Sequence, residues 1–223
     1  MIRWLVVFLS LLAIKAEAQD FHSIQFVPKF GSHPLELNTE YTLGNDKITF
    51  TNLKFYIADL SFFLKDSLIH RPDQKVFLID VSDSNSLKIF TNTKSTFDRI
   101  TFKIGIDSVT NVAGALDGDL DPVHGMYWTW QSGYINFKLE GIATNCPARL
   151  HKFYWHIGGY LQPFAAQRCI ELMGNFSKIK NVNIQIDELF KYIDISQTYN
   201  VMSPSVHAIE IADRLAGIFK ITD

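Results

Sequence analysis

After its first 18 residues, the sequence lacks any apolar run long enough to span a bilayer, so no later transmembrane helix is expected. It has no stripe of basic residues and a net charge of −2, which argues against nucleic acid as a partner. It also lacks a glycine-rich phosphate loop, the G-x-S-x-G and H-E-x-x-H motifs, and any paired-carboxylate motif. The sequence therefore gives no support to a hydrolase.

The first residues have the three parts of a secretory signal peptide. Arg3 supplies a positive charge, Trp4–Ile14 is an uncharged apolar run, and Ala16-Glu17-Ala18 places small residues at a cleavage site. The apolar run is shorter than the roughly 20 residues that cross a hydrocarbon core, although an N-terminal membrane anchor is the alternative. The residue directly after the predicted cleavage site is Gln19 and not a cysteine, so lipid anchoring is not indicated. We expect residues 1–18 to be removed and the protein to be periplasmic or secreted, without membrane insertion.

The chain has only two cysteines, Cys146 and Cys169. An even number in an exported protein favours one disulfide between them. Two free buried thiols are the alternative, because the sequence does not show whether the two Cα atoms come close enough to be bridged.

Short runs of aromatic and β-branched residues with period-two alternation recur along the chain, separated by Asn, Asp, Gly and Pro. The predicted strands are Phe21–Phe30, Lys47–Phe50, Leu53–Leu64, Lys75–Asp80, Leu87–Phe90, Arg99–Ile106, Tyr127–Glu140, Lys152–Ile157, Gln167–Met173 and Lys180–Ile186. This pattern predicts a mainly β protein, an antiparallel two-sheet β-sandwich. No internal repeat, low-complexity tract or Pro/Gly-rich linker divides residues 19–223, which predicts a single domain.

The C-terminal region predicts one or two short helices instead of strands. Asp187 begins DELFKYI, in which an acidic start precedes Leu189, Phe190 and Ile193. Ser203-Pro204 predicts the start of a second helix, with Ser as the N-cap and Pro at the first helical position. Apolar residues at helical spacing follow it, so this helix is expected to pack on the sandwich.

The segment GMYWTWQSGYINFKLEG, residues 125–141, contains two tryptophans, Trp128 and Trp130. Because they are two positions apart, on a strand they would share one face. Such a pair is normally part of the core.

The segment FYWHIGGY, residues 153–160, contains His156, which alternates with Tyr154 along a predicted strand. A single histidine is more often hydrogen-bonded than metal-bound. With a soft ligand such as Met126 or another histidine nearby, however, His156 would suit copper.

These two segments together resemble the MbnP-like copper-binding domain, a periplasmic family associated with methanobactin, in the form found in its Bacteroidetes-type branch. The resemblance extends to LKFYIADLSF (53–62), ITFKIGIDSVTNVAG (100–114) and NVMSPSVHAIEIAD (200–213), and so to nearly the whole chain after residue 18. It implies an all-β fold and a periplasmic copper site.

The resemblance also implies the chemistry of that site. In founding members of the family, one Trp of the W-x-W segment is oxidised to kynurenine by a di-haem partner enzyme of the MbnH, or cytochrome c peroxidase-like, type. Transferred to this chain, the modified residue is Trp128 or Trp130 and the ligand is His156. Kynurenine carries an aniline nitrogen, which is a ligand that tryptophan lacks.

One departure from the family pattern concerns the second histidine. Founding members carry an Asn-His pair upstream of the two tryptophans, whereas this chain has Thr110-Asn111-Val112-Ala113. His124, four residues before Trp128, is the nearest imidazole that could replace it, and Met126 is a further candidate ligand. The expectation is an exported, non-enzymatic copper-binding protein. The alternative is a structural or interaction β-sandwich that has kept the fold and lost the metal.

Overall fold

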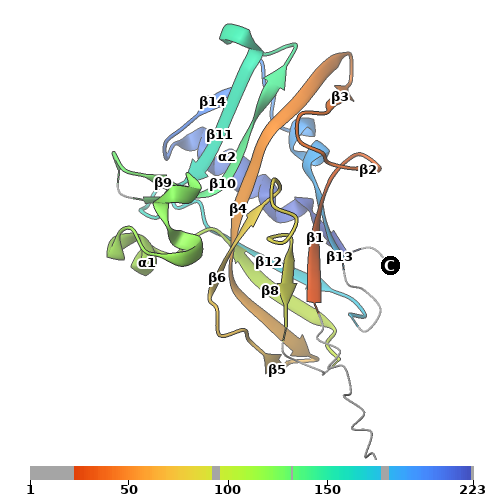
Figure 1. The fold of residues 1–223 in the computed structure, drawn as a ribbon, viewed down its shortest axis with the longest axis vertical. Helices are drawn as coiled ribbons and strands as arrows, with labels where there is room; N and C mark the ends of the chain where they lie inside the picture. Colours follow the sequence, from red (N-terminus) through yellow and green to blue (C-terminus); the bar gives the residue numbers. More distant parts are fainter. Residues whose placement is uncertain (1–22, 92–95, 132, 177–180, 222–223) are drawn as a thin grey trace, which may run out of the picture.

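The structure is a computed structural model of the chain that describes residues 23–91, 96–131, 133–176 and 181–221 (Figure 1). The predicted signal peptide, residues 1–18, lies outside the described residues. The described part consists mainly of strands, which form a ten-stranded and a five-stranded sheet.

The larger sheet is built around one long central strand, β4 (Asp46–Leu64), which joins two predicted strands into one. The sheet runs in the order β12 (Arg168–Met173), β8 (Arg99–Ile104), β4, β10 (Gly133–Ala143), β11 (Lys152–Gly158) and β14 (Asn200–Val201). Four shorter strands pair at its sides: β3 (Glu40–Leu43), β5 (Ser67–His70), β6 (Val76–Asp80) and β9 (Tyr127–Trp128).

The smaller sheet packs against one face of the larger one. Its strands are β15 (Phe219–Ile221), β13 (Asn181–Gln185), β1 (Ser23–Phe30), β2 (His33–Pro34) and β7 (Lys88–Phe90). Phe26 of β1 contacts Phe55 of β4 and Phe102 of β8 edge to face, with ring centroids 6.4 and 5.7 Å apart. The predicted β-sandwich is therefore confirmed. Its strands are not all antiparallel, however, because β1 with β13 and β11 with β14 pair in parallel.

The two faces of the larger sheet bury different sets of side chains. On β4, Leu53, Phe55 and Ile57 point into the main core and are fully buried. The alternating residues of β4 belong to the opposite, outer face. A second, smaller cluster covers part of this outer face and consists of Tyr56, Leu78, Ile106, Met126, Trp128, Tyr134 and Ile135.

Part of the outer face is covered by a segment between β8 and β9 that the alternation pattern does not predict. It contains the helix α1 (Ser108–Ala113) and two short 3₁₀ turns, η1 (Gly118–Leu120) and η2 (Pro122–His124). In Figure 1 it projects to the left of the sheet, beside β9. It leads directly into the two-tryptophan segment and so determines where these tryptophans lie.

The C-terminal region folds into a 3₁₀ segment, η4 (Ile186–Lys191), and the helix α2 (Val206–Ile218). Earlier in the chain, a 3₁₀ turn, η3 (Arg149–His151), precedes β11. The apolar side of α2 completes the main core through residues that include Ile211, Leu215 and Ile218. In the described ranges, no helix combines the length and the apolarity that crossing a bilayer requires.

The N-cap of α2 is Ser205 and not the predicted Ser203, because it is the Ser205 side chain that accepts a hydrogen bond from the backbone N–H of Ala208, at 3.2 Å. Ser205→Ala is therefore expected to lower the free energy of unfolding by about 1 kcal/mol. Ser203→Ala, the matched control, should leave it within about 0.5 kcal/mol of wild type. Urea unfolding followed by circular dichroism measures both, and equal losses in the two variants would contradict the assignment.

Candidate functional site

Strand β10 brings the two-tryptophan segment and the histidine segment together on the outer face. Trp128 of β9 pairs with Gly133 at the start of β10. Further along, Lys138 of β10 pairs with His156 of β11, and Ile135 pairs with Gly158. Two segments that are separate in the sequence are therefore neighbours in the sheet.

The indole of Trp128 lies directly against β11. A Cβ atom placed on Gly158 would be 2.7 Å from Cζ3 of Trp128 and 2.5 Å from the carbonyl oxygen of Tyr134. Alternate residues of a strand share a face, so His156 and Trp128 lie on the same side of β11. The absence of a side chain at Gly158 is what allows this close packing.

The two tryptophans differ in exposure. Trp128 is 6% exposed, whereas Trp130, which follows β9 in a turn, is 66% exposed. Their ring centroids are 5.9 Å apart, so the rings remain in contact. The Trp128 Nε1–H is buried and has no hydrogen-bond partner in the described part of the chain. The sequence analysis expected both tryptophans to be part of the core, and this is correct for Trp128 only.

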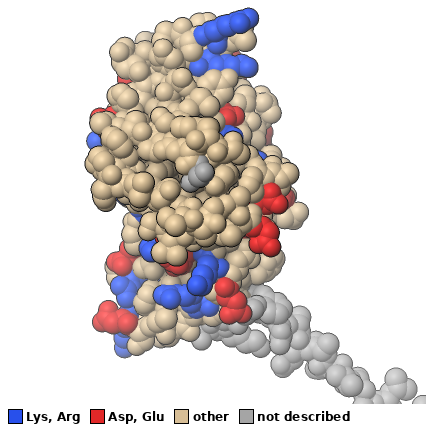
Figure 2. Space-filling view, turned by 90° about the vertical axis from the view of Figure 1, so that its left-hand side faces the viewer, with Lys and Arg blue, Asp and Glu red and all other residues tan. Residues whose placement is uncertain are grey.

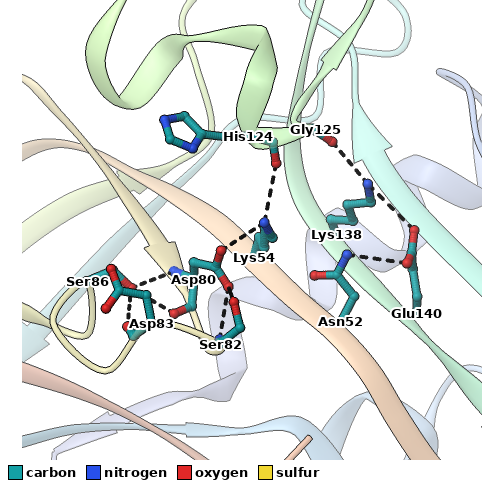
Figure 3. A network of polar contacts seen from close by, with 10 residues as sticks. All are labelled: Asn52, Lys54, Asp80, Ser82, Asp83, Ser86, His124, Gly125, Lys138 and Glu140. Carbon is teal, nitrogen blue, oxygen red and sulfur yellow. Dashed lines mark hydrogen bonds and ion pairs between the residues drawn. The ribbon is translucent and has the colours of Figure 1, made fainter.

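The imidazole of His156 is buried and paired with a carboxylate. Its Nε2 lies 2.6 Å from Oε1 of Glu140. Oε2 of Glu140 accepts a hydrogen bond from Nδ2 of Asn52 at 3.3 Å, and Nζ of Lys138 is 3.6 Å from Oε1 (Figure 3). The bond from His156, with the charge of Lys138, outweighs the opposing effect of burial and lowers the pKa of Glu140 to about 2. Glu140 is therefore ionised at neutral pH and accepts the hydrogen from Nε2.

Two lysines on neighbouring strands hold the segment that leads to Trp128. Lys54 and Lys138 pair across β4 and β10, and their Nζ atoms donate to the carbonyl oxygens of His124 and Gly125, at 3.3 and 3.0 Å (Figure 3). Lys54 also forms an ion pair with Asp80 at 2.8 Å. Burial opposes ionisation of Asp80, but hydrogen bonds from Lys54 and Ser82 keep its pKa below the usual value. The hydrogen bonds from the two lysines fix the end of η2 above the sheet.

The other two predicted ligands, His124 and Met126, lie in different surroundings. His124 is half-buried, and its Nε2 lies 3.1 Å from the carbonyl oxygen of Gly118. Met126 is fully buried, in the same small cluster as Trp128. Among the residues that the structure describes, no three His, Cys, Asp or Glu side chains lie close enough to hold a metal ion together.

The predicted disulfide between Cys146 and Cys169 is not formed, and both cysteines are free. Cys146 is buried beyond the end of β10, near the start of β4, and its thiol donates to the Lys152 carbonyl oxygen at 3.2 Å. Cys169 is exposed on β12 and pairs with Lys103, which pairs in turn with Ala58 of β4. Cys146 thus lies near the start of β4 and Cys169 beside its second half, level with Ala58. Because a strand rises about 3.3 Å per residue, the two cysteines are too far apart to be bridged.

A protein-family model described as MbnP matches residues 19–205. The chain belongs to the MbnP family. The predicted family resemblance is thereby confirmed over most of the sequence, and both segments that carried it fall inside the matched residues.

The fold agrees with a solved structure of this family. MbnP from Methylosinus trichosporium is similar to the chain with a TM-score of 0.59 and 14% sequence identity, over 84% of this chain and 82% of that one. At this identity the likeness shows the MbnP fold alone. No curated protein sequence matches the chain.

The sequence analysis did not predict that Lys138, Glu140 and Asn52 belong to the site, although the alternation pattern points to two of them. Lys138 and Glu140 alternate along a predicted strand, which indicates one polar face. Their partners Asn52 and His156 come from two other strands, so only the register of the sheet brings the network together.

Proposed function

We propose that this MbnP-family protein is exported and binds copper without catalysing a reaction, with His156 as one ligand and an oxidised Trp128 as another. The observation that carries the proposal is the packing of Trp128 against Gly158, two residues from His156 on the same face of β11. The two segments that mark the family thus meet at one place in the fold.

The hydrogen bonding of His156 suits a metal ligand. Because Glu140 is ionised, it accepts the Nε2–H, and the neutral imidazole then has its lone pair on Nδ1. Histidines that bind metals usually donate the other ring N–H to a carboxylate in this way. Imidazole nitrogen is a suitable donor for copper. His156 would therefore bind copper through Nδ1 while Glu140 orients the ring.

Tryptophan itself offers no acceptor atom, since its only polar group is the Nε1–H donor. Oxidation to kynurenine by a di-haem enzyme of the MbnH, or cytochrome c peroxidase-like, type would supply an aniline nitrogen. We assign the modification to Trp128 because its ring packs on β11, whereas Trp130 is largely exposed. By binding copper at this site, the protein would buffer copper in the periplasm or deliver it there.

Copper binding is expected to depend on His156. Protein purified from its native envelope should contain copper by elemental analysis, and the peptide 125–141 should have the mass of a kynurenine-containing form. His156→Ala should weaken copper affinity at least tenfold, because it removes the imidazole ligand. His33→Ala, which removes an exposed histidine of β2, is the matched control and should bind like wild type. Copper-free protein with an unmodified tryptophan mass would contradict the proposal.

The second candidate is a structural or interaction module without a metal, and the ion network favours it. Glu140, Lys138 and Asn52 already give the His156 ring a structural role, and the family's second histidine is missing from residues 110–113. In that case His156→Ala would lower stability, and wild type would show no copper binding that depends on His156. The same titration therefore separates the two functions.

A further inference from the structure

A cavity of about 170 Å³ lies beside Trp128, on the side away from the ion network of Lys54 and Lys138. The strand β9 and the start of β10 form one wall, and the loop that follows β11 forms the other. The lining residues are Trp128, Gln131, Gly133, Gly159, Tyr160, Leu161, Gln162, Phe164 and Pro204. None of them carries a charge at neutral pH.

The surface around this part of the molecule is also nearly uncharged. Figure 2 shows the side of the molecule on which β9 lies: its centre is mostly uncharged, acidic residues lie along the right-hand edge, and most other charged residues lie above and below. A charged ligand entering the cavity would lose its hydration and find no opposite charge in the lining, which is unfavourable. The cavity is therefore suited to a neutral molecule.

Aromatic rings and a few hydrogen-bonding groups make up the lining. The rings of Trp128, Tyr160 and Phe164 provide apolar walls, and aromatic rings favour contact with another ring. The amides of Gln131 and Gln162 can both donate and accept hydrogen bonds. This is the composition of small-molecule sites in general, mostly apolar with a few polar groups.

The loop wall is held in place by its own hydrogen bonds, so the cavity exists before any ligand binds. Ala166 N–H donates to the Gly159 carbonyl oxygen at 2.9 Å, and the Gln167 side chain donates to the Gly105 carbonyl oxygen at 3.0 Å. Gly159 has a φ of +120°, and a Cβ there would lie 2.3 Å from the Phe164 carbonyl oxygen. Only glycine fits this position, which lets the loop close tightly over the cavity.

We propose that this cavity binds a small neutral compound with a single aromatic ring and one hydrogen-bonding group. Its volume is close to that of an engineered apolar cavity of about 150 Å³ that binds benzene. Phenol is the simplest molecule with the required ring, neutrality and hydrogen-bonding group. This binding needs no metal and goes beyond the proposed copper function.

The test is a titration of the purified, metal-free protein with phenol, followed by NMR chemical shifts. Wild type should show saturable binding. Tyr160→Ala, which removes one wall, should weaken binding at least tenfold, whereas Tyr160→Phe should stay within about threefold of wild type. Tyr192→Ala, which removes an exposed tyrosine that does not line the cavity, is the matched control and should bind phenol like wild type.

A further variant and two further ligands complete the test. Leu161 is 66% exposed, so Leu161→Ala should leave the melting temperature unchanged and still weaken phenol binding several-fold. Benzoate, which is charged, and cyclohexanol, which is not aromatic, should each bind at least tenfold more weakly than phenol. Absence of saturable phenol binding, equal binding of benzoate, or unchanged binding in both Tyr160→Ala and Leu161→Ala would overturn the proposal. A failure of copper binding would not affect it.

Discussion

Replacing Gly158 by alanine is expected to lower the free energy of unfolding by about 3 kcal/mol. The added Cβ would lie 2.5 Å from the Tyr134 carbonyl oxygen and 2.7 Å from the Trp128 ring. The first neighbour is backbone in a paired strand and the second is a buried ring, so neither can move without breaking other contacts. The variant should therefore also displace Trp128, and its fluorescence should shift towards that of a solvent-exposed indole.

Gly217→Ala is the matched control for this prediction. Gly217 lies in α2, and a Cβ there would meet nothing within 4 Å. Alanine favours a helix over glycine, so this substitution is expected to raise the free energy of unfolding by up to about 1 kcal/mol. Urea unfolding at constant pH measures both variants. A Gly158→Ala protein within about 0.5 kcal/mol of wild type would show that Trp128 does not pack against β11 as described.

Much of the β structure could be predicted from alternation, since alternating apolar residues identify strands that have one buried face. Along β4, Leu53, Phe55 and Ile57 follow this rule and form the centre of the core. The helix α1 could not be predicted in this way. It has six residues and buries only Asn111, so it has no apolar periodicity. Its N-cap is Asp107, whose side chain accepts a hydrogen bond from the backbone N–H of Thr110.

The candidate site could be predicted in part, because Trp128 and His156 lie in recognisable segments. The different exposure of Trp130 could not be predicted. The segment was expected to be one continuous strand, but the chain turns between Trp128 and Gly133 and directs Trp130 towards solvent. Whether Cys146 and Cys169 form a disulfide could not be predicted from the sequence either, because it depends on the distance between the two cysteines in the folded sheet.

Glu140→Gln is expected to lower the free energy of unfolding by about 2 kcal/mol at neutral pH. Glutamine keeps the size of the side chain but removes the charge that pairs with Lys138 and accepts the hydrogen bond from His156. The displacement of the Glu140 pKa from 4.5 to about 2 corresponds to about 3 kcal/mol at most. One fifth of the side chain is exposed, so solvent screening reduces this value.

The stability that Glu140 contributes depends on pH. The folded-state pKa of Glu140 lies below its usual value, so its contribution is fully present above about pH 4.5 and is lost as pH falls through about 2. The difference in stability between wild type and Glu140→Gln should therefore shrink between pH 4.5 and pH 2, and urea unfolding across this range measures it. Glu36→Gln, at an exposed position, is the control and should stay within about 0.5 kcal/mol of wild type throughout. A difference that stays constant down to pH 2 would contradict the assigned ion network, and with it the orientation of His156 on which copper binding through Nδ1 depends.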